Sequence, residues 1–217
     1  MPELTDLRSS PIPPVIDAVV FDLGKVLLDW DPRYFYARHF RDDIAALEHF
    51  VMHIIPPAWI GEMDAGKPAA LAIAEQQRRH PEHAALIGLW AEGWPHMLRG
   101  EIEGTAALLG ELKARGFRLC ALTNFSTETF PIARERCPSL ALFEDIVVSG
   151  EIGLVKPDPR IYAHTNAHCR LHPQRTVFID DMPANVAAGR AAGWHALQFT
   201  SPQALRADLA ALGVLQD

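Results

Sequence analysis

The sequence predicts an α/β fold in which a parallel sheet is interrupted by an inserted helical cap. Short apolar runs of strand length alternate with helical patterns along most of the chain. Such alternation favours a parallel sheet whose strands are joined by crossover helices. The stretch 34–98 breaks this rhythm, because it carries helical patterns and no clear strand run.

The predicted strands are short apolar runs, as expected for strands that are buried on both faces. The first is 15–21 (VIDAVVF), which ends at Asp22. The others, in chain order, are 117–123, 145–149, 176–180 and the weaker 194–199. Helices are predicted at 105–116 and 184–194. Each of these helical patterns ends at or beside a glycine, which is a common helix stop.

The pattern divides the chain into three parts. Residues 1–14 are rich in proline and polar residues and predict a loose tail without the pattern of a secretory signal. Residues 15–33 and 99–217 predict a Rossmann-like parallel sheet core. Residues 34–98 hold FYARHF, ALEHFVMHII, AALAIAEQQRRH and ALIGLWAEGW, which are typical of short amphipathic helices and predict the cap.

Composition excludes several classes of protein. With 49% hydrophobic and 22% charged residues, the chain is not expected to be disordered. The formal net charge of −7 and the lack of a basic cluster argue against a nucleic-acid partner. No apolar run is long enough to predict a membrane span. The cysteines, Cys120, Cys137 and Cys169, form no disulfide pattern and favour a cytoplasmic location. The oligomeric state stays open.

Polar side chains follow the predicted strands at the points where the strands end. They are Asp22, Thr123, Asn124, Asp180 and Asp181, with Lys156 in the loop after 145–149. The carboxyl ends of parallel strands face one side of a sheet, where sites of such folds lie. Grouped carboxylates repel unless a cation or proton neutralises one, and hard oxygen ligands suit Mg²⁺. A lysine and a hydroxyl suit phosphate oxygens.

Four motifs in this order resemble the haloacid dehalogenase superfamily. They are VVFDLGKVL (19–27), LTN (122–124), Lys156 in GLVKPDPRIY, and FIDDMPANVAAGRAAG (178–193). The position of the helical stretch is similar to subfamily IA, whose members carry a helical C1 cap. The nearest branch resembles small sugar-phosphate phosphatases and the phosphatase domain of soluble epoxide hydrolases. The resemblance implies a Mg²⁺-dependent phosphatase that acts on a small phosphorylated metabolite.

The resemblance also implies a role for each motif residue. Asp22 would be the nucleophile that forms an aspartyl-phosphate. Thr123 and the backbone N–H of Asn124 would bind phosphate oxygens. Lys156 would neutralise charge on the nucleophile and on the phosphoryl group.

The same resemblance implies a metal site. The ligands would be the Asp22 carboxylate, the Gly24 carbonyl and Asp181, with Asp180 bound directly or through water. The cation would keep an anionic nucleophile from facing an anionic phosphate unscreened.

Two positions depart from the family pattern. Phosphatases of this superfamily usually have an aspartate two residues after the nucleophile, and it protonates the leaving group. Here that residue is Gly24. Three explanations stay open: a substrate with a good leaving group such as an anomeric sugar oxygen, a proton delivered by a cap residue or water, or weak activity. Lys25 stands where glycine or asparagine is usual; it either adds positive charge near the phosphate or points to solvent.

Two other functions compete with the phosphatase reading. A 2-haloacid dehalogenase uses the same nucleophile on carbon and needs no metal, but the paired Asp180 and Asp181 would then only add repulsion. The other alternative is a catalytically weak regulatory protein that binds a phosphometabolite. The unusual residues Gly24 and Lys25 are the features that support it.

Four further features have an interpretation at this stage. Asp158, between two prolines, predicts a helix N-cap. Asn185 either supports the fourth motif or caps its helix. Ser126 predicts a helix N-cap in preference to a substrate contact. The segment GEMDAGK (61–67) is the part of the cap most expected to contact substrate.

Overall fold

The computed structural model describes residues 15–216, so the tail predicted for 1–14 lies outside the described residues. A parallel sheet has the strand order β5-β4-β1-β6-β7. Its strands are β1 (Ala18–Phe21), β4 (Arg118–Thr123), β5 (Asp145–Val148), β6 (Thr176–Asp180) and β7 (His195–Gln198). Each lies within one of the predicted runs, and the predicted parallel sheet is confirmed.

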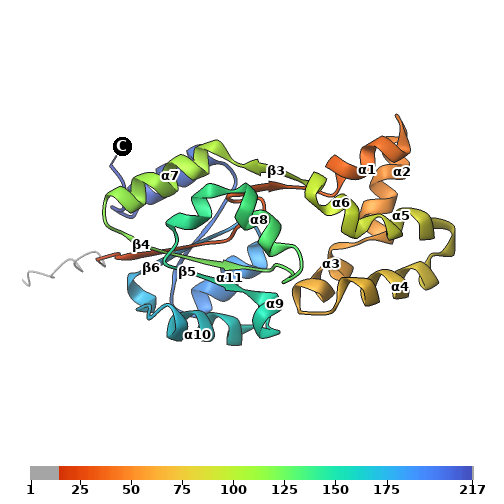
Figure 1. Ribbon diagram of the computed structural model, residues 1–217. Helices are drawn as coiled ribbons and strands as arrows, with labels where there is room; N and C mark the ends of the chain where they lie inside the picture. Colours follow the sequence, from red (N-terminus) through yellow and green to blue (C-terminus); the bar gives the residue numbers. More distant parts are fainter. Residues whose placement is uncertain (1–14, 217) are drawn as a thin grey trace, which may run out of the picture.

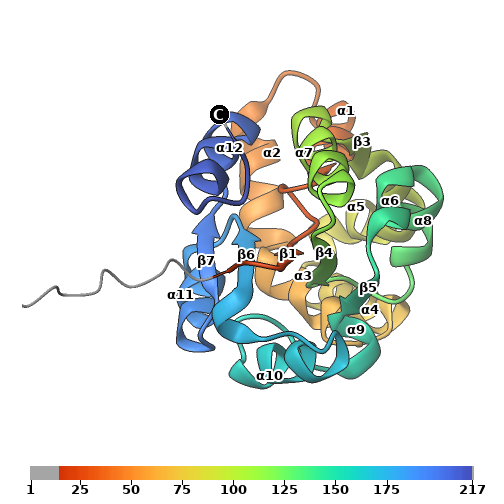
Figure 2. The same cartoon turned by 90° about the vertical axis from the view of Figure 1, so that its left-hand side faces the viewer.

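Helices cover both faces of this sheet (Figure 2). Helices α7 (Glu103–Ala114) and α12 (Pro202–Ala211) lie on one face, and α10 (Pro159–His168) and α11 (Pro183–Ala191) lie on the other. Alternate residues of β1 belong to the two cores: Val19 and Phe21 to the first, Ala18 and Val20 to the second. Because both faces are buried, β1 is apolar throughout and shows no polar alternation.

Local sequence explains where the helices on the second face begin. Pro159 and Pro183 stand in the first turn of α10 and α11, where a missing N–H costs nothing. The Asp158 carboxylate accepts a hydrogen bond from the Arg160 N–H at 2.9 Å, which confirms the predicted N-cap. The prediction for Ser126 is wrong. Helix α8 (Phe130–Arg136) begins later, and the Ser126 hydroxyl accepts from the Glu128 N–H at 3.2 Å within the preceding turn.

Close packing joins α11 to the sheet. A Cβ atom on Gly189 would lie 2.7 Å from the Phe178 ring of β6, so only glycine lets helix and strand approach this closely. The remaining short elements on the core side are α9 (Ser149–Ile152) and the 3-10 turns Pro138–Leu142 and Pro173–Arg175.

The segment between β1 and α7 is helical, apart from a small ribbon, and forms one group beside the sheet (Figure 1). Its helices are α1 (Arg33–Phe40), α2 (Ile44–His49), a π-helical turn (Phe50–Ile54), α3 (Pro57–Asp64), α4 (Ala69–Arg79), a 3-10 turn (Pro81–His83), α5 (Ala84–Gly88) and α6 (Trp90–Met97). Aromatic rings fill its interior, with Trp59 and Trp90 edge to face at 4.9 Å between centroids. The division of the chain into core and cap stays a prediction.

An antiparallel ribbon of β2 (Leu28–Trp30) and β3 (Leu98–Glu101) connects this helical group to the sheet. The sequence analysis did not predict it, because three- and four-residue strands are too short to show a period of two. Among the described residues, no single helix has the length and apolar character to cross a membrane; the bent pair Ile44–Ile54 and Pro57–Asp64 passes on those two criteria alone.

Candidate active site

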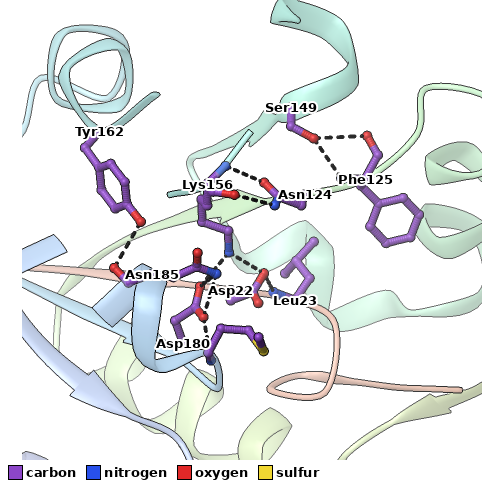
Figure 3. A network of polar contacts seen from close by, with 10 residues as sticks. Asp22, Leu23, Asn124, Phe125, Ser149, Lys156, Tyr162, Asp180 and Asn185 are labelled. Atoms are coloured by element: carbon purple, nitrogen blue, oxygen red, sulfur yellow. Dashed lines mark hydrogen bonds and ion pairs between the residues drawn. The ribbon is translucent and has the colours of Figure 1, made fainter. Parts of the chain in front are cut away.

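Asp22, Lys156 and Asp180 meet at the carboxyl end of the sheet (Figure 3). Asp22 follows β1, Thr123 ends β4 and Asp180 ends β6. Lys156 enters from the loop between α9 and α10. The fold therefore gathers side chains that are as far apart in sequence as Asp22 and Asp180.

Lys156 bridges two carboxylates in the interior. Its Nζ lies 2.8 Å from Asp22 Oδ1 and 2.6 Å from Asp180 Oδ2, and its side chain is only 1% exposed. Burial by itself lowers the pKa of this lysine, but Asp22 and Asp180 more than compensate, so the pKa is raised. Lys156 therefore stays a cation at the centre of the cluster.

Three carboxylates surround this point. Oxygen atoms of Asp22, Asp180 and Asp181 all lie within 4.8 Å of one another. The pKa of Asp22 is raised to about 7, chiefly by burial and also by Asp180 and Asp181, against the opposing effect of Lys156. The pKa of Asp181 is raised as well, by burial and by Asp180. Repulsion of this kind is relieved by a divalent cation, and the donor set of hard oxygens fits Mg²⁺.

Asn185 positions Asp180. Its Nδ2 donates to Asp180 Oδ1 at 2.9 Å and to Oδ2 at 3.1 Å, and the Met182 N–H donates to Oδ1 at 2.9 Å. Tyr162 in turn donates its hydroxyl to the Asn185 carbonyl at 3.0 Å. No side chain caps α11, so of the two interpretations of Asn185, support of the fourth motif is the one that the contacts favour.

Asn124 holds the loop that carries Lys156. Its side chain donates to the Lys156 carbonyl at 3.0 Å and accepts from the Lys156 N–H at 2.8 Å. This paired contact sets where the loop leaves the sheet edge. The sequence analysis named only the backbone N–H of Asn124, and the role of its side chain was missed because it depends on a residue 32 positions away.

Thr123 carries a polar atom without a partner. Its hydroxyl is buried, and within residues 15–216 no hydrogen bond reaches it. Buried hydroxyls are normally hydrogen-bonded, and one left unpaired at a cluster of charged groups points to a ligand that supplies the missing partner.

Gly24 and Lys25 follow the nucleophile in a tight turn. Lys25 is exposed and has a left-handed backbone, with φ of 61°. Its charge nevertheless lowers the pKa of Asp181, so the side chain is exposed to solvent and also acts on the carboxylate cluster. Gly24 is partly buried and faces a cavity.

Two cavities of about 110 and 80 Å³ share Ile60, Asp64, Trp94 and Thr129, and the smaller one reaches the nucleophile loop at Gly24. The larger is also lined by Met63, Ala69, Trp90, Ala91, Ser126, Glu128 and Ile132. The smaller is also lined by Gly24, Trp30, Asn124 and Phe125. Met63 and Asp64 belong to the segment 61–67, which the sequence analysis singled out. The sequence analysis did not distinguish Asp64 from its neighbours in that segment.

Comparison with known proteins identifies the family. Residues 16–193 match the haloacid dehalogenase-like hydrolases. The chain belongs to this family. The resemblance of the four motifs is thereby confirmed, and the protein is a hydrolase with the Rossmann-like fold of its family.

Relatives of this hydrolase include phosphatases. It is 28% identical to a sesquiterpene phosphatase of Aspergillus oryzae, over 84% of this chain and 89% of that protein. It is 28% identical to a phosphoglycolate phosphatase of Thiobacillus denitrificans, over 86% of this chain and 83% of that protein. A crystal structure of a family member from Bacteroides thetaiotaomicron, in complex with magnesium and inorganic phosphate, matches with a TM-score of 0.65. It has 19% identity over 85% of this chain and 94% of that chain, and shows that the fold is shared.

Proposed function

We propose that this hydrolase is a Mg²⁺-dependent phosphatase that cleaves a small phosphorylated metabolite through an aspartyl-phosphate on Asp22. The observation that carries the proposal is the meeting of three carboxylates and a buried lysine at one point, with the unpaired hydroxyl of Thr123 at the end of the neighbouring strand. Phosphoryl transfer needs an anionic nucleophile, positive charge near the phosphoryl group and donors for its oxygens. Asp22, Lys156 with the cation that the carboxylates would hold, and Thr123 would supply these.

Each residue has a role in this chemistry. An Asp22 oxygen attacks phosphorus, and the bond from phosphorus to the leaving oxygen breaks. Water then attacks the aspartyl-phosphate and releases inorganic phosphate. Lys156 keeps its contact to Asp22 and balances charge on the phosphoryl oxygens, while Thr123 donates its hydroxyl to one of them.

The carboxylates provide a fitting site for the metal. Asp22, Asp180 and Asp181 would hold Mg²⁺ together with the Gly24 carbonyl, and the ion would screen the nucleophile from the phosphate. Asn185 and the Met182 N–H fix the orientation of Asp180 for this purpose.

The acid cluster favours phosphatase chemistry over dehalogenation. A dehalogenase attacks carbon without a metal, and Asp181 would then lie beside the nucleophile as an uncompensated charge. A purely binding role is less favoured, because Lys156 contacts the nucleophile directly at 2.8 Å.

The cavities indicate the substrate. Their described lining is largely apolar, and its charged residues are Asp64 and Glu128, without a lysine or arginine. A second anionic group on the substrate would be repelled there. A phosphate ester of a compact apolar group fits this lining better than a phosphate that carries a carboxylate.

Hydrolysis of p-nitrophenyl phosphate with Mg²⁺ and with EDTA tests the proposal. We expect turnover that requires the metal and that disappears in Asp22→Asn, while the control Asp158→Asn, at the partly exposed N-cap of α10, stays active. No turnover by folded protein that still binds vanadate would refute the phosphatase. Chloride release from 2-chloropropionate would then test the dehalogenase. A panel of prenyl phosphate, glucose 1-phosphate and phosphoglycolate tests the substrate class, with prenyl phosphate expected to react fastest.

A further inference from the structure

The usual proton donor of the family is missing, and its place is open. A Cβ atom added to Gly24 would have no heavy atom within 4 Å beyond its chain neighbours. This space belongs to the smaller cavity, which Gly24 lines together with Trp30, Asn124 and Asp64. A leaving group in that cavity therefore has no carboxyl from the nucleophile loop beside it, and any acid must come from another wall.

Asp64 forms that other wall. It ends α3, lines both cavities and is partly buried. Its backbone is tied to the core, because Ser149 donates its hydroxyl to the Asp64 carbonyl at 2.6 Å. Close contact continues at Gly66, where an added Cβ would lie 3.2 Å from the Gly150 carbonyl oxygen. The backbone around Asp64 is thus held at the site by contacts with α9.

The surroundings of Asp64 favour a proton on it near neutral pH. Its pKa is raised to about 7, first by burial and then by the charge of Asp22, against the opposing effects of Lys156 and the Ser126 N–H. Glu128 is the other acidic residue in the lining of the larger cavity, and it accepts from the Ala69 N–H at 2.9 Å. A general acid works best when its proton is held close to the working pH.

We propose that Asp64 is the catalytic acid and base that replaces the missing aspartate at position 24. This inference rests on the proposed phosphatase function. As the Asp22–phosphorus bond forms and the bond to the leaving oxygen breaks, the Asp64 carboxyl gives its proton to that oxygen and the alcohol departs. Asp64 is then a carboxylate. It takes a proton from the water that attacks phosphorus, the Asp22–phosphorus bond breaks, and phosphate leaves with both aspartates restored.

The role of Asp64 is tested by comparing two leaving groups. p-Nitrophenolate can leave without a proton, whereas an alkoxide must be protonated as it leaves. Phosphate release from p-nitrophenyl phosphate and from n-butyl phosphate is measured for wild type and Asp64→Asn. The control is Glu62→Gln, on the same helix but outside both cavity linings. We expect kcat/KM of Asp64→Asn to fall roughly 10²- to 10⁴-fold on butyl phosphate and less than about tenfold on the aryl ester.

A second variant makes the test independent of folding. Because space is open at Gly24, Gly24→Asp in the Asp64→Asn background is expected to restore hydrolysis of butyl phosphate at least tenfold, a gain that a merely structural role for Asp64 would not allow. An equal loss on both esters, no loss on either, or no rescue would overturn the role of Asp64 alone. Wild-type protein inactive on both esters with Mg²⁺ would instead overturn the phosphatase, and this inference with it.

Discussion

Substitution of the buried Lys156 should destabilise the folded protein as well as inactivate the site. Lys156→Met keeps an unbranched side chain but removes the ammonium group, so Asp22 and Asp180 lose the contacts of 2.8 and 2.6 Å that now balance them. Deletion of one partner of a buried ion pair lowers the free energy of unfolding by about 3–5 kcal/mol, because the other charge stays buried without its partner. For a domain of this size, each loss of about 1 kcal/mol in the free energy of unfolding lowers Tm by roughly 2–4 °C, so the Tm of Lys156→Met should fall by roughly 6–20 °C.

The chain offers a matched control. Lys67 also bridges two carboxylates, Glu62 and Glu75, each at 2.6 Å, but its side chain is 24% exposed where that of Lys156 is 1% exposed. Solvent screens such pairs, so Lys67→Met should lose far less stability. Burial is then the variable that separates the two substitutions.

Urea unfolding in EDTA at about pH 8 measures both variants, because this pH lies above the pKa of about 7 that Asp22 has beside Lys156. The loss in Lys156→Met should shrink toward about pH 5.5, where Asp22 without its cationic partner takes up a proton in the folded state. Equal losses in the two variants, or a loss below about 1 kcal/mol for Lys156→Met, would refute the reasoning from burial.

Three other outcomes are expected. Thr123→Val should leave the free energy of unfolding unchanged, because the hydroxyl has no partner within residues 15–216, yet lower kcat roughly 10²-fold; lost stability in a urea titration would contradict this. Asn185→Ala should raise the Mg²⁺ concentration for half-maximal activity roughly 10- to 100-fold, as read from a metal titration, and an unchanged titration would count against its hold on Asp180. Because the pKa of both Asp22 and Asp64 is raised to about 7, the folded state binds protons between about pH 4 and 7 that the unfolded chain has released. Tm in EDTA should therefore fall as pH rises through this window, with a smaller slope in Asp22→Asn; a flat profile would show that these carboxyls titrate normally.

Most of the sheet and the motif cluster could be predicted from the sequence for one physical reason. A parallel strand covered on both faces must be apolar along its length, so β1, β4 and β6 stand out as short runs with polar residues at their ends. Parallel topology then brings those ends together. The convergence of Asp22, Asp180 and Lys156 follows from strand direction, which the alternation of strand and helix already indicates.

Local patterns were less reliable where a side chain had several possible partners. Ser126 has the composition of an N-cap, but α8 begins after a further turn, and the residue faces a cavity next to Asp64. Asn185 lies in the first turn of α11, a place common for capping, yet it reaches back to Asp180. Both outcomes depend on neighbours outside the local segment.

By itself, the sequence determined the parallel sheet, the order of the motifs and the residues at the strand ends, because these depend on periodicity and on chain direction. Only the tertiary structure decided which acidic residue of the helical segment lines the cavity beside Gly24. Amphipathic periodicity marks the side of α3 that is buried, but it does not say what that side meets. The position of Asp64 at the cavity beside Gly24 depends on how α3 packs against α9, through contacts such as Ser149 to Asp64 that span 85 residues.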